Sequence, residues 1–301
     1  MEQASFLTQK NHTVATIGFF DGVHRGHRFL LNRVCDEAKR LKINSIAITF
    51  DQHPRMVLQQ DFQPKLLTLF PEKMQLLQNS GINCCKILPF TRDLAQMSAG
   101  EFLEKVLYNI YNVKKLIIGH DHRFGHKREE SFKDYQKYAA RLGIEVEQTP
   151  AFVENGVTVS SSVIRRLLNE GNVKEANHYL GYNYALSGEV VHGNKIGSKI
   201  GFPTANIVVD NLKLIPKNGI YAVKIEVKGK FFDGMLNIGF RPTLNSTRTL
   251  SIEANIFDFS ENIYGENIKI IFIKRIRDER KFNNLDELAQ QLSIDKCFAI
   301  K

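Results

Sequence analysis

The 301-residue chain contains no tryptophan, only four cysteines and no long apolar run. A membrane-spanning helix needs about 18–20 consecutive apolar residues, so we expect no membrane insertion. Cys84 and Cys85 are adjacent, and Cys35 and Cys297 lie far from them, which fits neither a disulfide framework nor a CxxC metal knuckle. The first twenty residues also lack the basic segment and apolar run of a secretory signal. We therefore expect a protein of the reducing cytoplasm.

Charge of one sign is nowhere concentrated. Lys+Arg number 41 and Asp+Glu 32, a net charge of +9, so the partner is expected to be anionic: nucleic acid, an acidic membrane surface or small phosphates. The basic residues are dispersed over both halves and form no stripe interleaved with aromatic residues, as a nucleic-acid-binding surface would. We expect small phosphate-containing partners, with neither nucleic acid nor membrane, and a monomer or weak homo-oligomer.

The length predicts two domains. In the first half, β-rich runs alternate with stretches of helical periodicity, which is typical of a parallel sheet covered by helices on both faces. The pattern predicts an α/β, Rossmann-like nucleotide-binding domain. The expected strands are residues 14–19, 45–50, 86–89, 115–119 and 144–147.

The pattern changes near Gly181, and we place the domain boundary between residues 182 and 183. Beyond it, β-runs follow one another with turns and almost no helical periodicity, which predicts an antiparallel barrel or sandwich. A helix is expected at residues 284–292, with Leu285, Leu288, Ala289 and Leu292 on one face. The expected strands are residues 185–191, 221–227, 231–237, 250–257 and 268–276.

The most informative window of the first half is residues 17–27, IGFFDGVHRGH. A β-run ends in glycine and passes into an amphipathic helix, with His24 and His27 at the junction. The start of a helix offers unpaired N–H groups and the positive end of its dipole, which suits an anion. Gly22 and Gly26 allow close approach of a phosphate, and histidines can donate to its oxygens. A bare pair of this spacing also fits a structural cap or a shared metal.

The whole window, placed after the first strand, resembles the HxGH signature of the nucleotidylyltransferase superfamily. The resemblance implies that His24 and His27 hold the triphosphate of a nucleotide and stabilise the transition state. Further segments occur in the order found in the adenylylating module of bacterial bifunctional riboflavin kinase/FAD synthetases. They are residues 49–54 (TFDQHP), 64–68 (PKLLT), 119–125 (GHDHRFG) and 159–165 (VSSSVIR).

This resemblance implies two sets of ligands in the first half. A hydroxyl pair at the start of a short helix, with an arginine on its first turn, also suits a phosphate clamp physically, so Arg165 joins the two histidines as a catalytic residue. The residues implied to bind ATP are Gly18, Phe19, Asp21, His24, Gly26, His27, Ser161, Ser162 and Arg165. Those implied to bind the flavin are His53, Pro54, Asp121 and Phe124.

In the second half, a turn rich in glycine and lysine leads to residues 200–206, IGFPTAN. Such a turn suits a phosphate-binding loop, and its composition alone also fits a solvated hairpin. The string PTAN resembles the signature of riboflavin kinases. It implies that Thr204 and Asn206 hold Mg²⁺ with their side-chain oxygens. The residues implied to bind ATP here are Gly193, Lys195, Lys199, Gly201, Pro203, Thr204 and Asn206.

Residues 214–221, 237–243 and 251–255 continue this second match, and the last of these contains Glu253. An isolated glutamate in a strand is usually a solvent-facing residue. The resemblance implies that Glu253 is instead the general base, which accepts the proton of a ribityl hydroxyl as it attacks the γ-phosphate. It also implies that a flavin-side wall is formed by Arg277, Glu279 and Phe282.

The chain departs from the family pattern at five positions. Ser162 replaces threonine and keeps the hydroxyl, whereas Asn255 replaces a histidine and is expected to tune rather than abolish kinase activity. His120, His122 and His126 form a cluster without the carboxylate or cysteine that a metal site would need. The remaining departures are Phe19 for asparagine, Val163 for arginine and His122 for phenylalanine.

We conclude from the sequence that the chain is a bifunctional flavin-cofactor enzyme. Residues 183–301 are expected to form a riboflavin-kinase β-barrel with a C-terminal helix that makes FMN from riboflavin and MgATP. Residues 1–182 are expected to transfer AMP from ATP to FMN, giving FAD and pyrophosphate. The main alternative is a flavin-binding regulatory protein that has lost one activity, suggested by Phe19, His122 and Asn255. A monofunctional adenylyltransferase is disfavoured by the PTAN segment.

Overall fold

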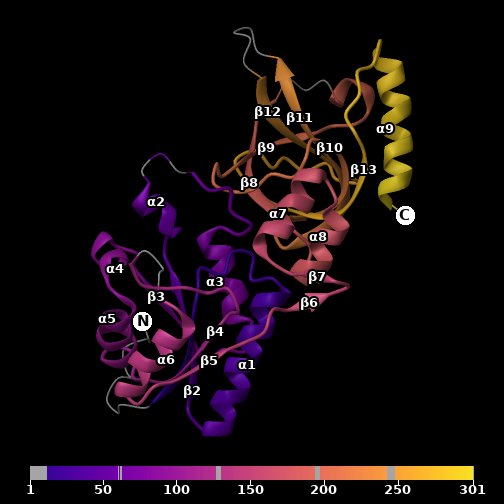
Figure 1. The fold of residues 1–301 in the computed structure, drawn as a ribbon. Coiled ribbons are helices and arrows are strands. Elements are labelled where there is room, and N and C mark those ends of the chain that lie inside the picture. The colour runs from indigo at the N-terminus through magenta and orange to yellow at the C-terminus, as the bar shows by residue number, and fades with distance from the viewer. Residues whose placement is uncertain are drawn as a thin grey trace. The chain divides into compact units, whose positions relative to one another are not determined.

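The structure is a computed structural model that describes residues 12–59, 61, 63–126, 130–193, 197–242 and 248–300. The chain divides into two compact units between Ser160 and Ser161 (Figure 1). Two helices, α7 (Ser161–Glu170) and α8 (Val173–Leu180), therefore belong to the second unit. The predicted boundary between residues 182 and 183 lies just beyond these helices.

The first unit contains a five-stranded parallel sheet in the order β3-β2-β1-β4-β5, as the alternating pattern predicts. The strands are β1 (Thr13–Ile17), β2 (Asn44–Phe50), β3 (Cys84–Leu88), β4 (Val113–Ile118) and β5 (Glu145–Gln148), followed by a hairpin of β6 (Val153–Glu154) and β7 (Val157–Thr158). The helical segments are α1 (Arg25–Leu41), α2 (Pro54–Leu58), α3 (Phe70–Gln78), α4 (Arg92–Gln96), α5 (Ala99–Glu101), the π-helical η1 (Phe102–Tyr108) and α6 (Phe132–Arg141).

Both faces of this sheet carry an apolar core. Successive strand residues point to opposite faces, so Ile117 packs with α1 and α3, whereas Leu116 and Ile118 pack with η1 and α6. A parallel sheet buried on both faces needs such continuous apolar strands. The resulting three-layer arrangement places the carboxyl ends of β1, β2 and β4 at one edge.

Strand β1 ends at Ile17, two residues earlier than predicted. The backbone φ angle is positive at Phe20, Gly22 and Val23 (55°, 83° and 37°). This left-handed conformation is incompatible with a continued strand, and it is rare for a β-branched residue such as Val23. The turn between β1 and α1 is therefore a strained segment in the window that the sequence singled out.

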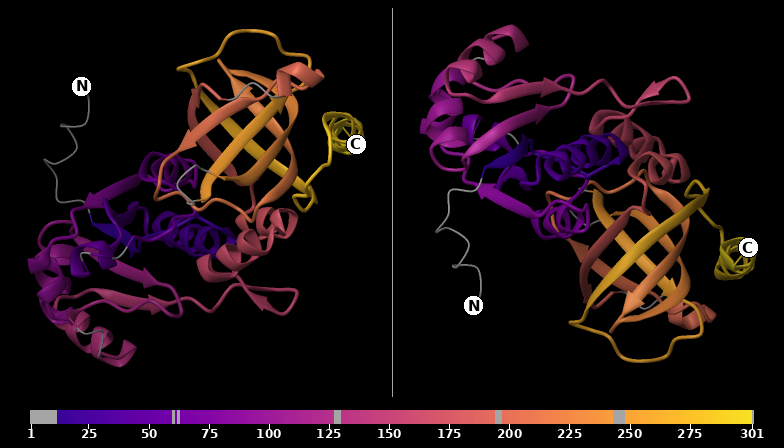
Figure 2. Two further views of the ribbon diagram at one scale, coloured as in Figure 1. Left: turned by 90° about the horizontal axis from the view of Figure 1, so that it is seen from above. Right: turned by 90° about the horizontal axis from the view of Figure 1, so that it is seen from below.

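The second unit is a closed barrel in the strand order β10-β11-β12-β9-β8-β13, with α9 outside its wall (Figure 2). Its strand pairs are antiparallel, as expected. The elements are β8 (Ala185–Val191), the 3₁₀ turn η3 (Gly197–Ile200), β9 (Ala205–Val209), β10 (Gly219–Val227), β11 (Lys230–Pro242), β12 (Arg248–Ile256), β13 (Asn267–Arg277) and α9 (Leu285–Ile300).

Two features of the barrel differ from the prediction. Strand β9 begins at Ala205, within the PTAN segment, and was not predicted. Helix α9 continues to Ile300 instead of ending at residue 292. Its fully buried Asp295 is held by the guanidinium of Arg277 on β13, with Nη2 to Oδ2 at 2.7 Å, and this ion pair fixes the added turns. Leu285, predicted to share one helix face with Leu288, Ala289 and Leu292, is 49% exposed.

In the described part of the chain, no helix is both long and apolar enough to span a membrane.

Candidate active sites

The first site is built where β1 passes into α1. His24 is the N-cap of α1, and its Nδ1 accepts from the backbone N–H of His27 at 3.3 Å. The two imidazole rings stack with centroids 3.6 Å apart. Gly26 is required here because a Cβ would lie 3.0 Å from the Val159 carbonyl oxygen and 3.2 Å from the His24 ring. The structure thus brings both histidines together at a helix N-terminus, which favours an anion.

His27 stays uncharged in the free protein. Burial, and then the neighbouring His24, lower the pKa of His27 well below 6.5. The His27 Nδ1 is buried and has no hydrogen-bond partner among the described residues. A phosphate group brought to this turn would supply both an acceptor and a charge that raises the pKa.

Asp21 braces this turn from inside. Its carboxylate is 4% exposed and accepts from the backbone N–H groups of Leu67 and Thr68 at 3.0 and 3.1 Å. The Thr68 hydroxyl in turn accepts from the N–H of Gly22 at 2.9 Å. Asp21 thereby ties the β1–α1 turn to the segment around residues 67–68, and its predicted contact with ATP stays a prediction.

Phe19 and His53 meet at the carboxyl ends of β1 and β2. Their rings make an edge-to-face contact at 4.8 Å, and His53 also caps α2, whose first residue is Pro54. The buried Lys73 of α3 contacts Phe19 of this pair, and sequence reasoning did not identify it as a site residue. Its Nζ donates to the Phe50 carbonyl at 2.8 Å and lies 4.1 Å from the Phe19 ring centroid. Burial lowers the pKa of Lys73 to about 8, against the opposing effect of Asp21 and Asp51.

The loop after β4 adds the other two residues predicted for the flavin. Asp121 is 80% exposed in its side chain. Phe124 is buried in the core and stacks on Tyr135 at 4.2 Å. Since β4 neighbours β1 where the strand order reverses, this loop lies beside the β1–α1 turn, the position where open α/β sheets bind their ligands.

Ser161, Ser162 and Arg165 lie on the first turns of α7, in the second unit. Ser162 is exposed, whereas Ser161 and Arg165 are partly buried. The helix begins at Ser161, so the hydroxyl pair occupies its N-terminus as predicted. Their assignment to ATP stays a prediction.

The second site is a pocket of about 250 Å³ between the outer face of the barrel and α9. Along β12, Ile252, Ala254 and Ile256 are buried in the barrel core, so Glu253 and Asn255 project to the opposite side, into this pocket. The full lining is Gly197, Ile200, Phe202, Thr204, Ile220, Met235, Leu236, Asn237, Glu253, Asn255, Arg277, Glu279, Arg280, Phe282, Leu288 and Leu292.

The carboxylate of Glu253 is held by two hydroxyls. The Ser251 Oγ donates to its Oε1 at 2.8 Å, and the Thr204 Oγ1 donates to its Oε2 at 3.3 Å. On the neighbouring strand β9, Asn206 is the register partner of Glu253. The candidate base therefore contacts one predicted Mg²⁺ ligand, Thr204, and is the strand neighbour of the other, Asn206, and both offer a hard side-chain oxygen. Sequence reasoning did not assign Ser251 to the site. Its position two residues before Glu253, on the same face of the strand, could have indicated that it contacts the carboxylate.

Asn255, the departure from the family pattern, has a definite contact. Its Nδ2 donates to the Pro203 carbonyl at 2.6 Å, which anchors the residue before Thr204. Gly193 faces the same segment, and a Cβ there would lie 1.9 Å from the Asn206 Nδ2. Only glycine leaves room for the Asn206 side chain. Gly201 has a φ of 80° and turns the chain into the PTAN segment.

Three predicted flavin-side residues, Arg277, Glu279 and Phe282, line this pocket. The guanidinium of Arg277 is occupied by Asp295 and by the Asp278 carbonyl, so it holds α9 in place. Glu279 accepts from the Asn218 amide at 3.2 Å and lies against Gly239, where a Cβ would clash at 1.9 Å.

Of the predicted phosphate-loop lysines, Lys195 lies outside the described residues, as does the side chain of Lys199. Among the residues that are described, no group of three or more His, Cys, Asp and Glu side chains could hold a metal ion.

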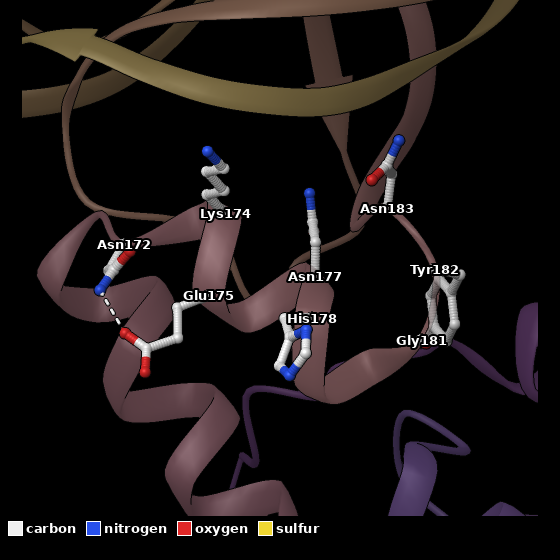
Figure 3. A pocket seen from close by; sticks show the side chains of 8 residues that line it. All are labelled: Asn172, Lys174, Glu175, Asn177, His178, Gly181, Tyr182 and Asn183. Carbon is white, nitrogen blue, oxygen red and sulfur yellow. Dashed lines mark hydrogen bonds between the residues drawn. The ribbon is translucent and has the colours of Figure 1, made fainter. Parts of the chain in front are cut away.

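Two other polar regions contain none of the predicted site residues. A hollow of about 620 Å³ lies along α8 (Figure 3). Its Asn177 amide is used internally, because it donates to the Phe272 carbonyl and accepts from the Tyr184 N–H. These bonds fix α8 to the barrel.

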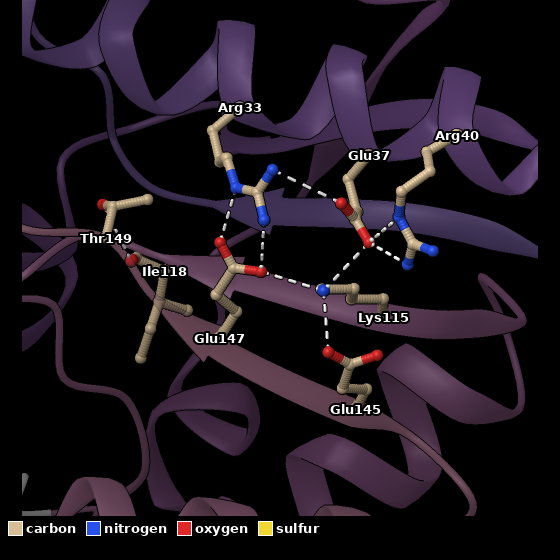
Figure 4. A network of polar contacts seen from close by, with 8 residues as sticks. All are labelled: Arg33, Glu37, Arg40, Lys115, Ile118, Glu145, Glu147 and Thr149. Atoms are coloured by element: carbon tan, nitrogen blue, oxygen red, sulfur yellow. Dashed lines mark hydrogen bonds and ion pairs between the residues drawn. The ribbon is translucent and has the colours of Figure 1, made fainter.

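The second region is an ion-pair network under α1 (Figure 4). Its centre is the buried Lys115 on β4, whose Nζ lies 3.0 Å from Glu37, 2.7 Å from Glu145 and 2.8 Å from Glu147. Arg33 and Arg40 of α1 complete it. The network joins α1 to β4 and β5 and is structural.

Comparisons with known proteins agree with this two-site geometry. The FAD synthetase family model matches residues 7–163, and the riboflavin kinase family model matches residues 180–301. A bifunctional riboflavin kinase/FMN adenylyltransferase of Escherichia coli (strain K12) is 37% identical over 287 residues, covering 95% of this chain and 91% of its own. That of Bacillus subtilis (strain 168) is 36% identical over 296 residues, covering 96% and 92%.

Among solved structures, one from Streptococcus pneumoniae, titled as a macrolide-efflux protein, has a TM-score of 0.89 and 30% identity. The match covers 97% of this chain and 95% of that one.

Proposed function

The chain belongs to the bifunctional riboflavin kinase/FMN adenylyltransferase family, and we propose that Glu253 and the His24–His27 pair carry its two reactions. The chain is a transferase that phosphorylates riboflavin with ATP and adenylylates FMN with ATP. The observation that supports the residue assignment best is the Glu253 carboxylate, held by two hydroxyls in a pocket.

In the kinase reaction, the terminal ribityl hydroxyl of riboflavin attacks the γ-phosphorus of ATP, and ADP leaves. Glu253 accepts the hydroxyl proton as the new O–P bond forms. The hydroxyls of Ser251 and Thr204 fix the carboxylate orientation, so the base does not have to reorient. Arg277 acts indirectly, because it holds α9 and so the pocket wall of Leu288 and Leu292.

We assign Mg²⁺ to the same place. The Thr204 hydroxyl and the Asn206 side-chain oxygen are hard donors beside Glu253, and Mg²⁺ takes such ligands together with phosphate oxygens and waters. Bound there, the ion would neutralise the charge of the transferring phosphate.

In the adenylyl transfer, a phosphate oxygen of FMN attacks the α-phosphorus of ATP, and pyrophosphate leaves. The nucleophile is already an anion, so alignment and charge neutralisation matter more than a base. The N-terminus of α1 and the stacked histidines supply that positive environment. The assignment of Ser161, Ser162 and Arg165 to the triphosphate rests on the family motif, and that of Phe19, His53, Pro54, Asp121 and Phe124 on the motif and their sheet-edge position.

A product assay with two variants tests this assignment. His27→Ala should lower FAD formation from FMN at least about 100-fold and leave riboflavin phosphorylation intact. Glu253→Ala should lower FMN formation about 100-fold or more and leave FMN adenylylation intact. FMN and FAD are separated by liquid chromatography after incubation with ATP and Mg²⁺. If each variant lost both products, two independent sites would be refuted.

No finding favours the alternative of a regulatory flavin-binding protein. We propose a cytoplasmic location and a monomer or weak homo-oligomer, on the composition given above.

A further inference from the structure

Among the polar side chains that line the kinase pocket, Asn237 has no role in the account so far. Asn237 lies on β11, in direct register with Glu253 of β12. Both line the pocket, so they share one face of the barrel wall. Directly opposed residues of antiparallel strands have Cβ atoms about 5 Å apart, which makes the two side chains neighbours.

The Oδ1 of Asn237 is buried and has no hydrogen-bond partner among the described residues. The other polar groups at this end of the pocket are engaged: Glu253 with two hydroxyls, Asn255 with Pro203 and Glu279 with Asn218. A buried acceptor without a partner destabilises the fold, so its presence here points to a ligand that satisfies it.

Asn237 belongs to a row of residues that are paired across four neighbouring barrel strands, and the chemistry of their side chains changes from one strand to the next. Asn206 of β9 pairs with Glu253 of β12, Glu253 with Asn237 of β11, and Asn237 with Ile220 of β10. The order is therefore an oxygen donor, a carboxylate, an amide and an apolar side chain. Ile220 shares its apolar end of the pocket with Leu288 and Leu292 of α9.

Riboflavin has the same order of groups: a terminal hydroxyl that meets the phosphate, a chain of secondary hydroxyls and an apolar ring. We propose that Asn237 binds the ribityl secondary hydroxyl next to the terminal one, with its Oδ1 accepting the hydroxyl proton in a hydrogen bond. Consecutive hydroxyls of the polyol are thereby engaged by neighbouring side chains, Glu253 and Asn237. This assignment rests on the proposed kinase function and makes Asn237 a specificity-determining residue for a polyol-bearing flavin.

The test uses the full-length protein and two substrates, riboflavin and 4′-deoxyriboflavin, which lacks the hydroxyl in question. Asn237→Ala should lower kcat/KM for riboflavin about tenfold, the value of one buried hydrogen bond. The same variant should have the same kcat/KM for the deoxy analogue as the original protein, because the analogue has no hydroxyl there for Asn237 to bind. The KM for ATP and the adenylylation of added FMN should not change.

A second variant separates binding from folding. Asn237→Leu keeps the branching at Cγ and removes the unsatisfied amide oxygen, so its melting temperature should equal or exceed that of the original protein while kcat/KM for riboflavin falls. Asp233→Ala, on an exposed part of the same strand, is the matched control and should leave kcat/KM unchanged. Equal losses with both substrates, or no loss with riboflavin, would overturn the proposal.

Riboflavin binding, followed by quenching of flavin fluorescence, distinguishes this failure from that of the proposed function. A protein that binds riboflavin and makes no FMN contradicts the kinase assignment. The dissociation constants of riboflavin and its deoxy analogue then decide the role of Asn237 separately.

Discussion

His27 is the residue whose charge is expected to change most when nucleotide binds. Burial and His24 keep its pKa well below 6.5, so it is neutral at pH 7. A triphosphate beside the ring raises that pKa, and ATP binding should therefore take up protons. Calorimetric titration of ATP in two buffers of different ionisation enthalpy measures the uptake. His27→Asn should show up to one proton less than the original protein, and equal uptake by both would contradict this role.

Asn255 shows how a departure from a family pattern can keep a site intact. Its amide holds the Pro203 carbonyl, and the next residue, Thr204, contacts Glu253. Asn255→Ala should raise the KM for MgATP in the kinase reaction about tenfold, because the PTAN segment loses one buried hydrogen bond. Asn255→His, which keeps a ring N–H donor, should recover part of the loss. An effect on the KM for riboflavin alone would argue against this anchoring.

At the scale of elements, the network under α1 stabilises the first unit. Lys115 is 4% exposed and joins three carboxylates, and although burial lowers its pKa, the glutamates raise it more, so it stays charged. Lys115→Met should lower the free energy of unfolding by about 1–3 kcal/mol, because the 2% exposed Glu37 loses one buried hydrogen-bond donor and keeps Arg33 and Arg40. Urea unfolding measures this. Lys105→Met, which breaks an exposed pair with Glu101, is the control and should cost less than about 1 kcal/mol.

The same network predicts a pH dependence of stability. The hydrogen bond from Arg40, and then that from Lys115, lower the pKa of Glu37 to about 2 against the effect of burial. The unfolded chain therefore binds this proton more readily, and the contribution is complete above about pH 4.5 and is lost as the pH falls toward 2. Its size is on the order of 3 kcal/mol. Glu37→Gln should flatten the unfolding free energy over that pH range, and an unchanged pH profile would refute the assignment.

The sequence predicted most of the elements because their signals are local. The strand β8 and the apolar face of α1 were read directly from alternation and helical spacing. Contacts between distant residues were not accessible in this way. The full length of α9 depends on Asp295 meeting Arg277 of β13, and in a sequence an aspartate on a helix reads as a solvent-facing residue.

At the scale of the whole molecule, the motifs identified the chemistry, while the structure identified how it is supported. Glu253, Thr204 and Asn206 were predicted from their strings and do meet. Ser251 and Asn237 lie in matched stretches that gave them no role, and their relevance comes from strand register with Glu253 or from sharing its face. The dispersed net charge of +9 fits two nucleotide reactions better than one polyanion surface.

Two separate chemistries in one chain make a further prediction. Glu253→Ala protein should make FMN, and His27→Ala protein should adenylylate it, at least about 100-fold more slowly, so each alone should convert riboflavin to FAD only at that residual rate. An equimolar mixture should convert it faster, because FMN made by one protein dissociates and binds the other. FAD should appear after a lag, and this lag should shorten as the protein concentration rises. Chromatography of FMN and FAD over time measures it. The double variant His27→Ala/Glu253→Ala is the control and should give neither product above the residual rate. If the mixture makes FMN that never becomes FAD, although His27→Ala retains its kinase and Glu253→Ala adenylylates added FMN at the same concentration, then free FMN is not the intermediate.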